Sequence, residues 1–373
     1  MKDYVSFELK AFFSKRKTVL LIVTLLGGAF LLFAAIHFQN LGDHEGEMYD
    51  ELNETRLTLR SVENYYREDS EDVTLADNVY QQQSLTATMY NGILFENSNW
   101  LYESGEELGN LRLEFAALNE DDELPDTLFP PIHESKRQVV EYNALQETSH
   151  DVLLDSRNTS DYLRLMMQYF GVFAFLFLAV FASDIGIEDF NHQTMVQGYP
   201  VHPGSKMLTQ VGIYLESILV GSLFVLFIAI IFVSLFWGMT DLTYPMGMYS
   251  FGGYQARPVW QGLLWFLLYY AFLALHIIIL SLLLNRLFKN MYATLVTMVF
   301  IYGLSFLFPN LSATFAWTPL PYYQMTAILE GAIAERGYSF AHLQNGILIL
   351  ALYAIAGLII MTISERRRAL KYK

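Results

Sequence analysis

Residues 18–37 have the sequence TVLLIVTLLGGAFLLFAAIH and contain no Asp, Glu, Lys or Arg. An α-helix rises about 1.5 Å per residue, so about 20 apolar residues cross the roughly 30 Å hydrocarbon core of a bilayer. The stretch is too long and too apolar for the core of a signal peptide, and no small-residue cleavage pattern follows it. We therefore predict a transmembrane helix that is retained in the protein.

Five more stretches reach or approach this length, near residues 163–183, 211–237, 259–284, 291–308 and 343–363. Hydrophobic residues make up 53% of the chain and charged residues 16%, whereas soluble domains carry about 25% charged residues. These patterns exclude an ordinary soluble enzyme. They predict an all-α membrane protein with six transmembrane helices.

The net charge of −15 over 373 residues is unevenly distributed. Residues 41–161 hold 28 acidic and 7 basic residues, a local charge of −21, and the rest of the chain carries +6. An acidic block of this size repels phosphates, so nucleic acid is not expected as a partner. Because the chain has no cysteine, disulfides, thiolate chemistry and cysteine metal sites are excluded.

The orientation follows from the lysines and arginines that flank the predicted spans, because such residues accumulate in cytoplasmic connections. The opposite side offers only Arg257 and Arg336, with Arg164 at the edge of a span. The rule predicts that both termini are cytoplasmic and that the acidic block is extracellular. The thirteen basic residues on the predicted cytoplasmic side are Lys2, Lys10, Lys15, Arg16, Lys17, Lys206, Arg286, Lys289, Arg366, Arg367, Arg368, Lys371 and Lys373.

Four parts of the chain follow from these boundaries. Residues 1–17 are expected to form an interfacial cytoplasmic helix before the first span at 18–37. Residues 38–162 are expected to form an acidic extracellular helical domain, or long extensions of the flanking spans, with a break at 119–131 and a last helix from about 133 to 160 that leads straight into the second span. Residues 163–373 contain spans two to six, with a proline-rich re-entrant outer segment at 309–342.

The cytoplasmic connection 184–210 has the sequence DIGIEDFNHQTMVQGYPVHPGSKMLTQ. Asp184, Glu188 and Asp189 stand near its start, and Pro200 and Pro203 near its end. The segment between them is expected to form a short helix across the end of the bundle. Its carboxylates would lie close to the positive end of the helix dipole.

The sequence contains no phosphate-binding loop, no HExxH and no GxSxG. We expect no catalytic residue, and the spacing of His192 and His202 with Asp184 and Asp189 matches no common metal pattern. Two ionisable residues, Glu216 and His276, lie within predicted spans, and intramembrane charges often mark transport pathways. The alternative is structural: Glu216 pairs with Lys206 or Arg286, and a neutral His276 bonds a neighbouring helix.

The order of these elements resembles the permease subunits of ATP-binding cassette exporters of the second class. The connection carries a Glu, a Thr, a Pro and a Lys at the spacing that is frequent in that family, and FELKAFFSKRK (residues 7–17) is similar to its basic lead-in to the first span. The chain departs from the pattern at Gln193, where a Gly is usual, and at the added Pro203. The four matching residues are Glu188, Thr194, Pro200 and Lys206.

The resemblance implies that the connection docks onto a separate ATPase subunit, present in two copies, which binds ATP and Mg. Asp184 and Asp189 would belong to the same coupling segment. A second permease subunit, identical or related, would complete the transport path in the cell membrane, in contact with lipid. We expect the source to be a Gram-positive bacterium. The low internal charge suits a hydrophobic or amphipathic cargo, such as a peptide, an antimicrobial or a lipid.

A second hypothesis is a membrane sensor or scaffold whose acidic extracellular domain binds a cationic peptide or another ligand. Such a protein needs a cytoplasmic output domain, and only about ten residues follow position 363.

Overall fold

The computed structural model describes residues 2–66, 73–119, 129–148, 150, 156–187, 203–308, 310 and 314–371. These residues are mostly helical, and five helices are long and apolar enough to cross a membrane. They coincide with five of the predicted spans, so the chain has the architecture of a membrane-embedded protein. The five are α2 (Arg16–Gln39), α7 (Thr159–Ala182), α10 (Pro203–Trp237), α11 (Val259–Phe288) and α16 (Leu343–Lys371).

The remaining predicted span forms α12 (Met291–Leu307). Its 17 residues extend about 25 Å, which is slightly less than the hydrocarbon core. The helix begins at a defined N-cap, where the Asn290 side chain accepts a hydrogen bond from the Tyr292 amide at 2.9 Å. A helix is therefore present at the predicted position, but it is shorter than the other five.

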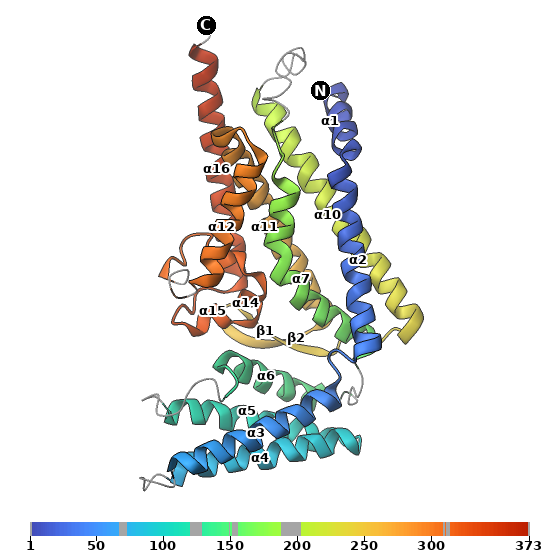
Figure 1. Cartoon of the computed structure of the whole chain (residues 1–373), viewed down its shortest axis with the longest axis vertical. Coiled ribbons are helices and arrows are strands. Elements are labelled where there is room, and N and C mark those ends of the chain that lie inside the picture. Colours follow the sequence, from blue (N-terminus) through green and yellow to red (C-terminus); the bar gives the residue numbers. More distant parts are fainter. Residues whose placement is uncertain are drawn as a thin grey trace.

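The two ends of the bundle differ (Figure 1). Helix α1 (Lys2–Ser14) and the last turns of α16 lie at one end, here called the terminal end, and helices α3–α6 lie beyond the other. The helix expected within residues 1–17 is thus present. Helix α10 begins at Pro203, before the predicted span start at 211, so residues 203–210 are helical. Proline suits this position because the first helical residue needs no N–H donor.

Helices α3 (His44–Tyr66), α4 (Val73–Leu94), α5 (Ser98–Leu118) and α6 (Ile132–Thr148) form a separate domain, the α3–α6 domain. One expectation for this region is wrong. Helix α6 ends at Thr148 and does not continue into the second span. A new helix, α7, begins at Thr159, and the Asn158 side chain caps it by accepting a hydrogen bond from the Asp161 amide at 2.8 Å.

Helices α5 and α6 approach one another closely at two glycines. A Cβ atom on Gly105 would lie 2.6 Å from the ring of Tyr142, and one on Gly109 would lie 2.6 Å from Cγ2 of Val139. Both distances are shorter than any real contact, so a side chain at either position would force the helices apart.

A β-hairpin lies between the bundle and the α3–α6 domain (Figure 1). Strands β1 (Pro245–Ser250) and β2 (Gly253–Pro258) pair antiparallel, with Ser250 opposite Gly253. The two turn residues, Phe251 and Gly252, have φ of 53° and 79°, which is the pattern of a type I′ turn. The sequence analysis did not predict this hairpin, and it is an addition to the expected all-helical fold.

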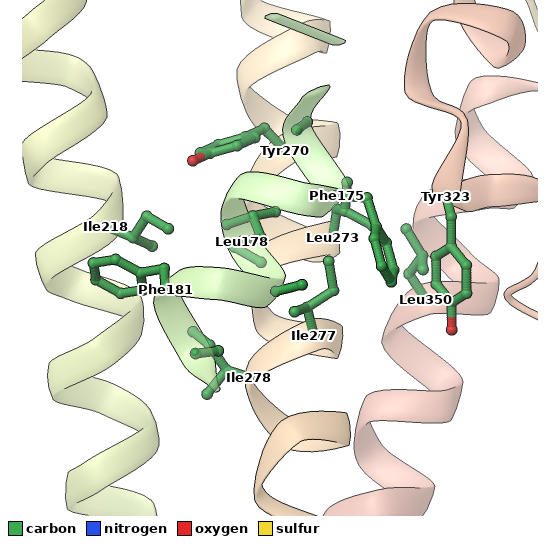
Figure 2. Close-up of a cluster of buried hydrophobic side chains, with 14 of the residues drawn as sticks. Phe175, Leu178, Phe181, Ile218, Tyr270, Leu273, Ile277, Ile278, Tyr323 and Leu350 are labelled. Carbon is green, nitrogen blue, oxygen red and sulfur yellow. The ribbon is translucent and has the colours of Figure 1, made fainter. Parts of the chain in front are cut away.

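The centre of the bundle is built from α7 and α11 (Figure 2). Phe175 and Leu178 on α7 pack with Leu273 and Ile277 on α11, and all four are buried. The peripheral helices expose large apolar side chains, including Leu31, Phe227, Leu235 and Phe300. Exposed apolar surface on this scale fits helices that face lipid.

The proline-rich segment at 309–342 forms short helices over the part that the structure describes: η2 (Pro321–Tyr323), α14 (Met325–Glu330) and α15 (Ala332–Glu335). They pack against α7, β1 and α6.

Candidate functional site

The start of the connection 184–210 is fixed by an ionic cluster at the terminal end of the bundle, the Asp184 cluster, made of Lys15, Lys17, Ser183, Asp184 and Tyr214. Lys15 Nζ donates to Asp184 Oδ2 at 3.0 Å, and Lys17 Nζ donates to Asp184 Oδ1 at 2.7 Å. The same amines also donate to the hydroxyls of Tyr214 at 3.2 Å and Ser183 at 3.0 Å. One carboxylate therefore joins the α1–α2 junction to the residues that follow α7.

The charge state of Asp184 is set by these neighbours. Burial would raise the pKa of its carboxyl, but the positive charges of Lys17 and Lys15, and the hydrogen bonds from their amines, more than offset burial. The pKa of Asp184 therefore lies below its ordinary value. The carboxylate is ionised at neutral pH, and both ion pairs are in place.

Helix α11 holds the backbone at the same point. Asn285, which is fully buried, donates from Nδ2 to the carbonyl oxygens of Ser183 and Ile185 at 2.9 and 2.8 Å. Ser281 Oγ donates to the carbonyl of Ala182 at 2.7 Å. Displacement of residues 183–185 would therefore break bonds to α2 and to α11 together.

The other end of the connection is bonded to α1. Gln210 on α10 donates from Nε2 to Glu8 Oε1 at 3.2 Å, and the same Glu8 oxygen accepts from the hydroxyl of Tyr4. Phe12 of α1 packs edge-on against Phe181 of α7 and Tyr214 of α10. Helix α1 and the residues directly after it thus contact both ends of the 184–210 segment.

The predicted coupling residues are placed as follows. Asp184 lies in the ionic cluster, and Lys206 lies in the first turn of α10 at the same end of the bundle. Glu188, Asp189, Thr194 and Pro200, like His192 and His202, lie outside the described residues, as does the central part of the expected short helix.

Sequence analysis missed the roles of Lys15, Lys17 and Asn285. The two lysines were assigned only to the cytoplasmic flank of the first span. Asn285 carried a usable signal, since it is an amide within the apolar run SLLLNRLF (residues 281–288). A buried amide in such a run requires hydrogen-bond partners.

The two ionisable residues of the spans are not brought together. His276 on α11 is buried, and its Nε2 lies 3.0 Å from the hydroxyl of Tyr323. Glu216 is exposed on α10. Because α10 is one continuous helix, Lys206 lies about 15 Å from Glu216 along its axis, and the expected ion pair between them does not form.

We expect Tyr323→Phe to destabilise the bundle by about 1–3 kcal/mol, because it removes the hydrogen bond at His276 Nε2 and leaves a buried polar group unsatisfied. His276 Nδ1 already has no hydrogen-bond partner among the described residues. The measurement is the denaturation midpoint of the purified protein in detergent. The double variant His276→Leu/Tyr323→Phe should recover part of the loss, and a Tyr323→Phe variant as stable as the parent would contradict a structural role for this bond.

An apolar groove of about 510 Å³ lies between α2, α7, α10 and α11. Its walls include Leu32, Phe170, Phe173 and Val225. Four of its lining residues carry hydroxyls, Thr24, Tyr169, Ser222 and Tyr270, and the last two bond one another at 3.2 Å. The lining of the groove is otherwise mainly hydrocarbon.

At the terminal end of the bundle, the charged groups of the Asp184 cluster join helices to one another. No group of three or more His, Asp or Glu side chains among the described residues is placed to hold a metal. No family model, curated protein or solved structure matches this chain.

Proposed function

We propose that this chain is the transmembrane permease subunit of an ATP-driven ABC exporter that moves a hydrophobic or amphipathic substrate across the cytoplasmic membrane. The observation that carries the proposal is the anchoring of both ends of the 184–210 connection, at Asp184 and at Gln210, to α1 and to the residues that follow it. A partner that moves the connection would shift α1, α2, α7, α10 and α11 together. Coupling between an ATPase and a transport path requires such a mechanical link.

The proposed topology has six spans, with α12 as the fifth. Its 17 residues span a locally thinned bilayer at a modest energetic cost. Both termini would then be cytoplasmic, the α3–α6 domain extracellular and the short helices of 309–342 re-entrant in the outer leaflet. The basic residues near the terminal end support this orientation. The cell membrane of a Gram-positive bacterium is the proposed location.

The apolar groove supports the class of cargo. A wall made mainly of aliphatic and aromatic side chains suits acyl chains or apolar peptide side chains better than a hydrated ion. We place the transport path beside this groove, between this chain and a second permease subunit. ATP and Mg would bind to two copies of a separate ATPase subunit.

The test is co-purification. The chain, expressed together with the genes that neighbour its own, is expected to carry an ATP-binding cassette ATPase through purification and to transport cargo only with that subunit. Glu188→Arg combined with Pro200→Ala should reduce both association and transport at least tenfold, since these residues occupy the proposed docking segment. Glu107→Gln, on the exposed face of α5, is the matched control. Normal association and transport in the double variant would refute the proposal.

A second candidate function, a sensor or scaffold, is favoured by one observation. A groove of about 560 Å³ on the α3–α6 domain is lined by six carboxylates and two arginines, and such a surface attracts cationic peptides. Salt-dependent binding of a cationic peptide to the intact chain, with no ATPase associated, would favour this function over transport. The carboxylates are those of Glu47, Asp50, Glu51, Glu54, Glu134 and Glu141.

A further inference from the structure

Four ion pairs join the α3–α6 domain to the rest of the described structure. Each has one partner in α3 or α6 and the other in α7, α14 or α15. Two of the four use histidine, whose ordinary pKa lies within the physiological pH range. The pairs are His44 with Asp161 at 3.0 Å, His133 with Glu335, Arg137 with Glu330 at 3.4 Å, and Arg164 with Glu141 at 2.5 Å.

The first histidine pair lies at the start of two helices. His44, in the first turn of α3, places Nε2 3.0 Å from Oδ2 of Asp161, in the first turn of α7. The Asp161 side chain is 5% exposed and also accepts a hydrogen bond from Asn158 Nδ2 at 2.8 Å. A carboxylate this deeply buried depends on its partners, so the charge of His44 affects the contact directly.

A cavity of about 340 Å³ adjoins this pair, between α3, α6, α7, α11, α14 and β1. It places several further charges near His44. Glu47 is on the same helix and Arg164 is on α7 beside Asp161, and both act on the charge of His44. The other charged groups that line the cavity are Arg137 and Glu141 on α6 and Glu330 on α14.

The second histidine pair joins α6 to α15. His133, in the first turn of α6, bonds through Nδ1 to Oε2 of Glu335 on α15. The two side chains are 13% and 21% exposed, so neither is fully solvated. Glu330 on α14 also faces His133, with Arg137 and Glu134 of α6 beside it.

Strand β1 of the hairpin contacts α6 directly. A Cβ atom on Gly247 would lie 2.3 Å from Cγ of Arg137, so α6 rests directly on the backbone of β1. The Gly247 amide donates to Glu141 Oε2 at 3.0 Å. The α3–α6 domain is thus held on the bundle by a backbone contact with β1 and by the four side-chain pairs.

We propose that the His44–Asp161 pair is a proton-dependent latch, which seats the α3–α6 domain on the bundle when His44 is protonated and loosens it when His44 is neutral. The His133–Glu335 pair is a second contact between the same two parts of the chain. Arginine stays charged near neutral pH, so the two arginine pairs keep the domain attached when the His44 contact weakens. The latch is independent of the proposed transport function, because it concerns only how two parts of this chain contact each other.

The direction of the pH effect follows from the pKa shifts outside the spans. Burial would lower the pKa of His44, but the hydrogen bond to Asp161 and its charge raise that pKa above the ordinary value of 6.5. The contact is therefore at full strength below about 6.5 and is lost as pH rises through the raised pKa of the seated state.

Carboxylates set the acid limit of the latch. Burial would raise the pKa of Glu335, but its bond to His133 lowers that pKa below 4.5, so this pair persists at mildly acidic pH. Burial raises the pKa of Glu47 and of Glu330 above 4.5, and their negative charges are lost first on acidification. The latch should be tightest between about pH 5 and pH 6.5.

The experiment uses the absence of cysteine from the chain. Spin labels on Glu107→Cys in α5 and Ser339→Cys beyond α15, both exposed positions, report the distance between the domain and the bundle by double electron–electron resonance in nanodiscs. We expect one narrow distance distribution at pH 6.0 and a distribution at least twice as broad, or shifted to longer distances, at pH 8.5. His44→Gln/His133→Gln should give the broad distribution at both pH values.

His342→Gln is the matched control, because His342 bonds Gln344 in its own segment at 3.0 Å, and it should keep the transition. His44→Arg provides a second test that does not depend on loss of a charge, since it should narrow the distribution at pH 8.5. An unchanged distribution in the parent between the two pH values would overturn the latch. A transition that survives in the double glutamine variant would overturn it equally, and neither result bears on the permease proposal.

Discussion

Asp184→Lys is expected to detach the 184–210 connection from α1 and α2. The introduced lysine would face Lys15 and Lys17, which now bind the carboxylate at 3.0 and 2.7 Å. The side chain of Asp184 is 14% exposed, and removing one partner of a buried ion pair costs about 3–5 kcal/mol. We expect a clearly lower denaturation midpoint in detergent and a loss of ATP-driven transport, with normal insertion into the membrane.

Two variants separate the charge from the packing. Asp184→Asn keeps a hydrogen-bond acceptor and should lose less stability than the lysine variant. Exchange of the partners, Lys17→Asp with Asp184→Lys, should restore part of the stability, because it returns one attractive pair to the cluster. Equal stability of Asp184→Lys and the parent would show that the ionic cluster is not an anchor.

Replacing both close-contact glycines of α5, Gly105→Leu with Gly109→Leu, is expected to unfold or separate the α3–α6 domain. A Cβ atom at either site already lies 2.6 Å from a side chain of α6, and overpacking of this kind costs about 1–3 kcal/mol per site. Amide hydrogen exchange in α5 and α6 should rise at least tenfold, and exchange in α7 and α11 should stay unchanged. Glu107→Leu, on the exposed face of the same helix, is the control and should exchange at the rate of the parent. Equal protection in the double glycine variant would contradict the contact.

The apolar helices could be predicted from hydropathy because a membrane span is decided by the composition of about 20 consecutive residues. The start of α10 could not be predicted this way, since residues 203–210 (PGSKMLTQ) do not form a continuous apolar run and the helix begins at a proline. The break between α6 and α7 was missed for a related reason. It depends on a local cap, the Asn158 side chain on the Asp161 amide, and not on periodicity.

The hairpin was missed because its signal is weak and slightly misplaced. The pair Gly252-Gly253 indicates a two-residue turn, but the observed turn residues are Phe251 and Gly252. The strands contain prolines, glycines and methionines, which do not alternate clearly in polarity.

The candidate site was predictable only in part. Asp184 was selected as a residue of the connection, at the start of an expected helix, but its ion pairs with Lys15 and Lys17 join residues 167 or more positions apart in the chain. Contacts at such separations arise from the packing of helices and leave no local pattern in the sequence. Tyr323 shows the same limit: tyrosine is a residue type that is enriched at membrane interfaces, but Tyr323 is buried and lies beside His276 in the bundle.

Site-specific photo-crosslinking shows whether the 184–210 connection docks onto an ATPase, as we propose. A single cysteine at Thr194→Cys, labelled with a photoreactive maleimide in membranes of cells that express the chain and its neighbouring genes, should capture a protein whose sequence contains the ATP-binding cassette motifs. Ser339→Cys, outside the connection, should capture none. We expect capture at position 194 alone. Efficient labelling at position 194 with no ATPase captured would contradict it.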